Sequence, residues 1–256
     1  MSRALPPLDL HAHLETDLSA RDLEGLGAVV FAATRSLAEF DQTLTRKDLV
    51  TVWGVGCHPG LRVAQEAFDS EAFAAAMRVT PFVSEIGLDG RSAVPAALQT
   101  ATFTSILRLA TATPRLLSVH SYGATSAVVD LLESHDFKGA ILHWWLGTAD
   151  ETQRAIDLGC YFSVNHSMAR KAGLISSLPV DRLLFETDHP SGDRSSPQPR
   201  RPGTVQPVEQ LLAAQRNMSM MAIREQAWRN FGRLVEQLGV AAMMTTPIQK
   251  MIEAAR

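Results

Sequence analysis

The stretch Asp9-Leu10-His11-Ala12-His13, near the start of the chain, is the one around which the rest is organised. The apolar residues before and within it predict a buried β-strand. Side chains along a strand alternate between its faces, so the aspartate and both histidines are expected to project to one side. Two imidazoles placed in this way can bind one metal ion. A pair of core histidines is the alternative, and the motif alone does not decide between the two.

The composition is that of a globular protein with a full hydrophobic core. Hydrophobic residues make up 46% and charged residues 20% of the 256 residues, which fits one barrel or two small domains. The formal net charge of −3 gives no general attraction to polyanions, so binding of nucleic acid would need metal ions or a local basic patch. The sequence shows no signal-peptide pattern and no apolar stretch of about 18 residues, and we expect a cytoplasmic protein without membrane contacts.

The two cysteines, Cys57 and Cys160, each lie in an apolar segment that resembles a strand. We therefore expect reduced, buried thiols and neither a disulfide nor a cysteine-based zinc site.

Strand-like and helical segments alternate along most of the chain. Eight alternations over this length predict an α/β protein with a TIM-like (β/α)8 barrel, followed by C-terminal helices. An open, doubly wound sheet is the alternative, but the chain has no glycine-rich phosphate-binding fingerprint, which favours the barrel. After the histidine pair, strands are expected near residues 28–34, 51–59, 81–89, 116–122, 139–146, 161–165 and 182–189, and helices near 36–48, 61–78, 95–110, 124–134, 150–158, 208–217 and 220–238.

The segment 190–207, after the eighth predicted strand, is too rich in Pro, Ser and Arg for a regular element. We interpret it as a long loop on the active face, where Arg194, Arg200 and Arg201 are candidate anion contacts. An interdomain linker and a solvated charged loop are the alternatives.

We expect a single barrel over residues 1–238 and a helical tail over residues 239–256. Thr246 followed by Pro247 is typical of a helix start, so the tail is expected to form a short amphipathic helix. Packing on its own barrel is the first interpretation, and docking of a partner protein is the alternative.

Histidines or carboxylates occur at or near the ends of five predicted strands, where the catalytic residues of such barrels lie. These are the ligands that zinc, manganese and magnesium bind. Six ligands exceed the needs of one tetrahedral ion, so we expect two ions about 3.5 to 4 Å apart, bridged by Glu85. The expected ligands are His11, His13, Glu85, His120, His143 and Asp188.

The expected chemistry is hydrolysis by a two-metal mechanism. Besides binding metal, Asp188 can take a proton from the attacking water as general base. His58 can donate a hydrogen bond to a phosphate oxygen, or it simply ends a strand, and both interpretations stay open. Asp89 is four residues after Glu85, an even spacing that places both side chains on one face of a strand. It is therefore a candidate to hold a histidine ligand in place. No nucleophile-elbow pattern of the serine hydrolases occurs.

Six short motifs carry these candidate residues. They are His11-Ala12-His13, Gly56-Cys57-His58-Pro59, Glu85-Ile86-Gly87-Leu88-Asp89, Val119-His120-Ser121, Leu142-His143 and Glu186-Thr187-Asp188. In this order they are similar to the signatures of the TatD-type metal-dependent deoxyribonucleases, from Leu8 to about Phe231. The resemblance implies a distorted β/α barrel that uses Mg, Mn or Zn to cleave DNA or RNA phosphodiesters, often from a 3′ end. It also implies the same six ligands and places His58 near the substrate phosphate.

The chain departs from the family pattern at residues that would contact substrate. Gly90 stands where the family has tyrosine, and Tyr122 stands where it has an arginine that could hold phosphate. Trp144-Trp145-Leu146 and the Arg200-Arg201 loop also replace family sequences. The short Glu85–Gly90 motif and the run 159–164 are similar to the TatD-like subgroup of Qat-type anti-phage systems, which implies partner subunits.

We therefore expect a nuclease that acts on DNA more than on RNA. One of the paired tryptophans at 144 and 145 could stack a base, although such pairs also occur in cores. A hydrolase of amides or esters is one alternative, but many related barrels use a carbamylated lysine where this chain has Glu85. A metal-bound scaffold with little turnover is the other.

Overall fold

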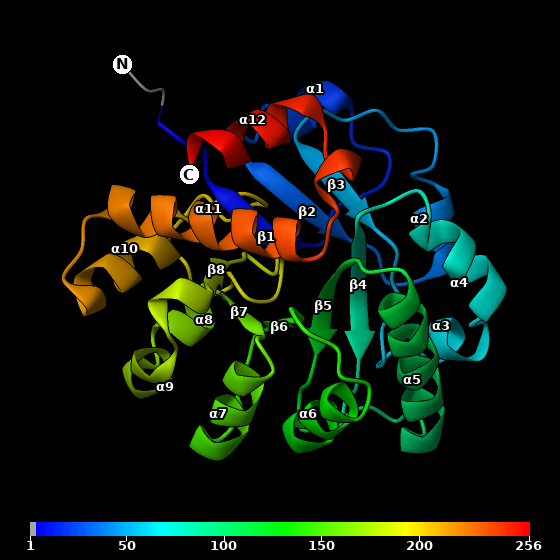
Figure 1. Cartoon of the computed structure of the whole chain (residues 1–256). Helices are drawn as coiled ribbons and strands as arrows, with labels where there is room; N and C mark the ends of the chain where they lie inside the picture. Colours follow the sequence, from blue (N-terminus) through cyan, green and yellow to red (C-terminus); the bar gives the residue numbers. More distant parts are fainter. Residues whose placement is uncertain (1–3) are drawn as a thin grey trace.

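The computed structural model describes residues 4–256, in which parallel strands alternate with helices (Figure 1). The strands form two sheets with the orders β1-β2-β3 and β4-β5-β6-β7-β8. The strands are β1 (Leu8–Ala12), β2 (Val29–Ala33), β3 (Thr51–Gly54), β4 (Phe82–Gly87), β5 (Leu116–His120), β6 (Ile141–His143), β7 (Tyr161–Val164) and β8 (Leu183–Phe185).

Helices surround these strands. The helices are α1 (Ala20–Glu24), α2 (Leu37–Asp41), α3 (Arg62–Glu66), α4 (Ser70–Met77), α5 (Ala96–Ala112), α6 (Thr125–Ser134), α7 (Ala149–Asp157), α8 (His166–Ala169), α9 (Ala172–Ser177), α10 (Gln206–Arg216), α11 (Met220–Gln237) and α12 (Thr246–Ala254), with 3-10 turns η1 (Val180–Arg182) and η2 (Ala241–Met243).

Backbone hydrogen bonds join the two sheets at both seams. Between β3 and β4, the N–H of Val55 donates to the carbonyl of Phe82 (3.1 Å) and the N–H of Ser84 donates to the carbonyl of Val55 (2.8 Å). Between β8 and β1, the N–H of Asp188 donates to the carbonyl of His11 (2.8 Å). The predicted α/β barrel architecture is confirmed.

Two predicted helices differ from the observed ones. The segment 61–78 forms two helices, because the side chain of Asp69 accepts a hydrogen bond from the N–H of Ala72 (2.8 Å) and starts α4 after a break. The segment 36–48 forms only the five-residue α2. Helices α8 and α9 lie where no helix was expected.

Helix α11 covers the end of the barrel where the strands begin. Trp228 and Phe231 pack in one apolar cluster with residues from the first half of the strands, including Leu8 and Leu116. The indole N–H of Trp228 donates to the carbonyl of Pro6 (2.8 Å). This end is therefore closed, and the ends of the strands that carry the candidate ligands lie opposite.

The tail joins the same cluster. Ile248 and Ile252 of α12 are buried in it, so the tail packs on its own barrel as expected. The N-cap is Thr245 and not Thr246 as expected, and the hydroxyl of Thr245 donates to the carbonyl of Leu49 (2.6 Å). The division at residue 238 stays a prediction.

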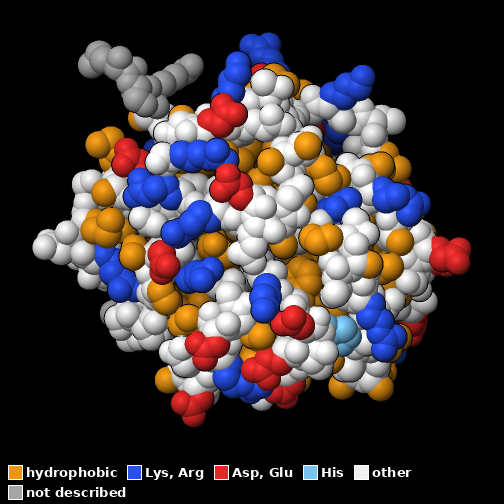
Figure 2. Space-filling view, viewed as in Figure 1, with side chains coloured by type: hydrophobic (Ala, Val, Ile, Leu, Met, Phe, Trp, Pro, Cys, Tyr) orange, Lys and Arg blue, Asp and Glu red, His pale blue; other side chains and the backbone are white. Residues whose placement is uncertain are grey.

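The surface and the thiols agree with the composition. Figure 2 shows basic and acidic side chains interspersed on the face viewed. No helix in residues 4–256 is long and apolar enough to cross a membrane. Cys57 and Cys160 are free and buried as expected, and burial raises the pKa of each thiol to about 12.

The buried carboxylate of Asp9 ties together β1 and two segments that are distant in sequence. It accepts hydrogen bonds from the N–H (2.8 Å) and the hydroxyl (2.6 Å) of Thr187, and from the N–H of Gly203 (2.8 Å). The pairing of β1 with β2 contains an extra residue on β1 between Asp9 and Ala12. The expectation that Asp9 projects beside the histidines is therefore wrong, because this irregularity interrupts the strict alternation.

Asp9→Ala is expected to lower the free energy of unfolding by about 3 kcal/mol. The substitution leaves buried donors of Thr187 and Gly203 without an acceptor, and each unsatisfied donor costs about 1–3 kcal/mol before relaxation. Urea denaturation measures the change. The exposed Asp41→Ala is the matched control, with a change below about 0.5 kcal/mol. A loss below about 1 kcal/mol in Asp9→Ala would contradict the role given to its carboxylate.

Candidate metal centre

Glu85, buried on β4, lies among five histidines, of which four are candidate ligands and the fifth is His58. Its Oε1 is 2.7 Å from Nδ1 of His120 and 3.1 Å from Nε2 of His143. Its Oε2 is 3.4 Å from Nε2 of His13 and 3.8 Å from Nε2 of His11. Each oxygen of the carboxylate therefore faces a different pair of histidines.

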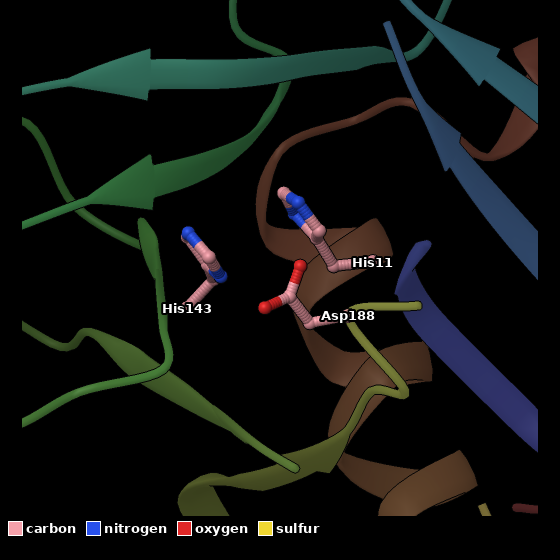
Figure 3. Close-up of side chains that lie close together, drawn as sticks. All are labelled: His11, His143 and Asp188. Carbon is pink, nitrogen blue, oxygen red and sulfur yellow. The ribbon is translucent and has the colours of Figure 1, made fainter. Parts of the chain in front are cut away.

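Asp188 completes the group from the segment after β8. Figure 3 shows its carboxylate pointing toward His11 of β1 and His143 of β6, and ligand atoms of these three residues lie within 4.8 Å of one another. Its Oδ1 is also 3.8 Å from Nε2 of His13. With Glu85, all six candidate ligands thus lie in one cluster at the carboxyl ends of the strands.

Hydrogen bonds prepare two of the histidines to bind metal. Nδ1 of His13 lies 2.9 Å from the carbonyl of Ala33, which can only accept, so this nitrogen carries the proton and Nε2 presents a lone pair. Nδ1 of His11 is 2.7 Å from the hydroxyl of Ser118, while its Nε2 is buried and has no hydrogen-bond partner within residues 4–256. Burial lowers the pKa of His11 to about 4, so its ring is neutral. Oε2 of Glu85 is also buried and has no hydrogen-bond partner among the described residues.

The cluster contains more negative charge than its own groups neutralise. Burial lowers the pKa of His143, but the carboxylates of Glu186 and Glu85 outweigh it and raise that pKa well above its ordinary value. Burial raises the pKa of Asp188 to about 8. A proton on these groups is therefore favoured when no other cation is present, and a divalent ion can take the place of that proton. The unpartnered nitrogens and oxygens and this charge balance fit a metal centre.

Glu186 contacts Nδ1 of His143, the ring nitrogen that does not face Glu85, and the sequence analysis did not assign it this role. It is fully buried, with Oε1 lying 3.6 Å from Nδ1 of His143. The same oxygen accepts from the N–H of Trp144 (3.1 Å) and from Nδ2 of Asn165 (3.0 Å), and the hydroxyl of Ser163 donates to Oε2. A carboxylate two residues before Asp188 was the available signal.

Glu186→Gln is expected to lower metal affinity by about 10- to 100-fold, the usual effect of losing a carboxylate behind a histidine ligand. The amide keeps the volume but removes the charge that holds His143. Titration of the metal-free protein with Zn²⁺ against a competing chelator measures the affinity. The exposed Glu253→Gln is the control, and unchanged affinity in Glu186→Gln would show that the contact is only structural.

Asp89 and His58 lie beside the cluster. Oδ2 of Asp89 is 3.5 Å from Nε2 of His120, so Asp89 faces the far nitrogen of that histidine. His58 has Glu85 and His120 close enough to form a ligand group with it. However, its Nδ1 accepts the N–H of Gly60 (2.8 Å), so in the neutral ring the proton lies on Nε2, 3.4 Å from Glu85 Oε1. Burial lowers the pKa of His58, which favours this neutral ring. His58 therefore presents a donor to the cluster.

A cavity of about 540 Å³ opens on the cluster. His120, His143 and Trp144 line it, together with Arg194. Trp145, in contrast, is fully buried and belongs to the core.

The two other arginines of the loop lie elsewhere. Arg200 and Arg201 are exposed, and Nη1 of Arg200 donates to the carbonyl of Arg194 (2.7 Å). Neither is among the described residues that line the cavity, and their contact with substrate stays a prediction.

The sequence profile of the TatD-related DNases matches residues 8–236. The chain belongs to the TatD-related DNase family. It is 27% identical over 254 residues to the "Uncharacterized metal-dependent hydrolase YabD" of Bacillus subtilis, covering 88% of this chain and 97% of that protein. A shorter match of 118 residues, 33% identical, covers 42% of this chain and 45% of the "3'-5' ssDNA/RNA exonuclease TatD" of Edwardsiella piscicida. The mouse "Putative deoxyribonuclease TATDN3" is 27% identical over 125 residues, which cover 48% of this chain and 42% of that protein.

Solved structures of TatD proteins have the same fold. The TatD homologue YJJV of Escherichia coli superposes with a TM-score of 0.76 at 21% identity, covering 89% of this chain and 96% of that one. A TatD-family hydrolase of Entamoeba histolytica gives 0.73 at 14% identity, covering 91% and 99%. The expected family, barrel fold and metal-dependent hydrolase class of this TatD-related protein are thus confirmed.

Proposed function

We propose that this TatD-related hydrolase is a two-metal phosphodiesterase that removes nucleotides from the 3′ end of single-stranded nucleic acid, DNA in preference to RNA. The observation that carries the proposal is the Glu85 carboxylate, whose two oxygens face separate pairs of histidines. The name of the Edwardsiella piscicida relative supports the polarity and the single-stranded substrate.

The donor set suits two divalent ions of the Mg, Mn or Zn class. His11, His13 and Asp188 would hold one ion with Oε2 of Glu85, and His120 and His143 would hold the other with Oε1. Two bound ions supply a water nucleophile at neutral pH and stabilise the negative charge that develops on the phosphate.

The remaining steps fall to protein side chains. Asp188 would accept the proton that the attacking water loses as its oxygen bonds to phosphorus, because its carboxylate lies among the histidine ligands. The bond from phosphorus to the 3′ oxygen of the preceding nucleotide breaks, and that oxygen takes the proton back from Asp188 and leaves as a hydroxyl group. Nε2–H of His58 donates to a non-bridging oxygen of the phosphate, since its Nδ1 is already engaged by Gly60.

The test is hydrolysis of a short 5′-labelled single-stranded oligonucleotide by the purified protein. Wild-type protein with Mn²⁺, Mg²⁺ or Zn²⁺ is expected to produce a ladder of products shortened stepwise from the 3′ end. A chelator is expected to abolish the ladder and added metal to restore it. Parallel assays use an RNA of the same sequence, and an amide, a lactone and an ester. Cleavage that survives the chelator, or turnover confined to the small substrates, would overturn the proposal.

We also propose that the protein acts in the cytoplasm as one subunit of an anti-phage assembly. The similarity of Glu85–Gly90 and of residues 159–164 to the Qat-type subgroup supports this. A partner would bind a surface other than the buried apolar face of α12. Co-purification of neighbouring gene products with the tagged protein, and loss of phage protection in a Glu85→Ala strain, test this role.

A further inference from the structure

The cavity beside the metal centre contains two positive side chains without a negative partner. Lys171 and Arg194 both line it, and within residues 4–256 neither forms an ion pair with a carboxylate. By contrast, Arg46 and Arg224 bind carboxylates. With a net charge of −3, unpaired cations at this cavity are a local attraction for an anion.

Hydrogen bonds join the two loops that carry these cations. The N–H and the hydroxyl of Ser167, in α8, donate to the carbonyl of Gly192 (3.3 and 3.0 Å). Nδ1 of His166 is 3.1 Å from the hydroxyl of Ser195. A Cβ at Gly192 would lie 2.9 Å from Cβ of Asp188, so the loop packs directly against a candidate ligand. The positions of Lys171 and Arg194 are therefore tied to the metal centre.

Arg194 is also held by an aromatic ring. Its guanidinium carbon lies 5.8 Å from the centroid of Trp144, within the range of a cation–π contact. The backbone N–H of Trp144 donates to the carboxylate of Glu186, which also faces His143. This chain of contacts fixes the guanidinium at the cavity without using its charge on a carboxylate.

Tyr122 adds an exposed aromatic surface to the same cavity. Its side chain is 53% exposed although it is large and apolar. It follows His120 by two residues, so it lies beside a candidate ligand. An exposed ring next to unpaired cations is the combination that binds single-stranded nucleic acid, where bases stack on aromatic side chains and phosphates contact basic ones.

We propose that this cavity binds the nucleotide next to the scissile phosphodiester, with its phosphate on Lys171 and Arg194 and its base stacked on Tyr122. The inference rests on the proposed function and specifies how its substrate is held. The volume of about 540 Å³ lies within the usual range of about 300–1,000 Å³ for ligand sites. A base can stack on Tyr122 only when it is unpaired, so the cavity selects single strands over duplexes. The cations at 171 and 194 take the place of the arginine that Tyr122 replaces.

The test uses metal-loaded protein and a short single-stranded DNA, with Lys171→Ala, Arg194→Ala and the double variant. Each single substitution is expected to raise KM, and the Kd measured with a non-cleavable phosphorothioate, about tenfold while metal content stays the same. The slope of log affinity against log salt is expected to fall by about 0.7 for each lost contact. The loss is expected to be larger for the oligonucleotide than for bis(p-nitrophenyl) phosphate, which has no flanking nucleotide.

Matched controls separate this site from general charge effects. Lys250→Ala on α12 and Arg108→Ala on α5 remove the same charges from exposed positions outside the cavity, and both are expected to behave as wild type. Tyr122→Ala is expected to raise KM roughly tenfold, and Tyr122→Phe to restore it, because stacking needs the ring and not the hydroxyl.

The outcomes distinguish this inference from the proposed function. Cleavage of the oligonucleotide with unchanged KM and salt slope in the Lys171 and Arg194 variants would overturn the subsite and leave the nuclease in place. Binding without cleavage, weakened in these variants alone, would support the subsite and overturn the proposed phosphodiesterase activity. If wild-type protein does not bind the oligonucleotide, the subsite is overturned.

Discussion

Replacing Glu85 by alanine is expected to lower kcat/KM for the oligonucleotide on the order of 10⁴-fold, because the metal ligands act as a unit. Oε1 of Glu85 lies within 3.1 Å of His120 and His143, and Oε2 lies within 3.8 Å of His11 and His13. Without its carboxylate, the four histidine ligands and Asp188 remain, but the negative charge between the two pairs of histidines is lost. Steady-state kinetics and elemental analysis of the purified variant measure the two losses together.

A shorter carboxylate at position 85 and a substitution of a remote glutamate test whether the effect comes from the position of the Glu85 carboxylate. Glu85→Asp keeps the charge but withdraws both oxygens by one methylene, so an intermediate activity and reduced metal content are expected. The exposed Glu71→Ala on α4 is the control for charge and is expected to match wild type. Full metal content with wild-type turnover in Glu85→Ala would show that the centre assembles without a bridging carboxylate.

Asp188→Asn is expected to lower kcat roughly 10³-fold, within the range for loss of a general base. Asparagine keeps an oxygen for the metal but cannot accept the proton of the attacking water. Because the five other candidate ligands are unchanged, metal content is expected to fall far less than in Glu85→Ala. Single-turnover kinetics measure the chemical step.

The exposed Asp150→Asn on α7 is the matched control for Asp188→Asn. If Asp188→Asn retains kcat but binds metal weakly, Asp188 is a ligand only, and another group takes the proton.

The strand ends and the cluster that they form could be predicted because they depend on local patterns. Each candidate ligand follows an apolar run with a turn or a helix start after it, and parallel strands bring such positions to one end of a barrel. His11 and Glu85 are 74 positions apart in the sequence, but both lie near the carboxyl ends of their strands. Whether the six residues hold metal stays a prediction.

The remaining features depend on contacts between distant segments. The extra residue in β1 is visible only from its pairing with β2, so alternation alone misplaced Asp9. Glu186 has its meaning only beside Trp144 and His143. Helices α8 and α9 are short and without a clear periodic pattern, and their packing brings Lys171 to the cavity.

The end of the barrel that α11 and α12 cover is the suitable side for attaching the protein to a surface. α11 and α12 lie at the end opposite the ligands, and Arg256, the last residue, pairs with Glu236 on α11. Figure 1 shows the marked C end beside α11 and α12. A sensor chip or a bead attached at Arg256 would therefore leave the cavity beside the candidate ligands facing the solution. Binding of single oligonucleotides to this cavity can then be measured on the immobilised protein, because the linker lies at the opposite end of the barrel.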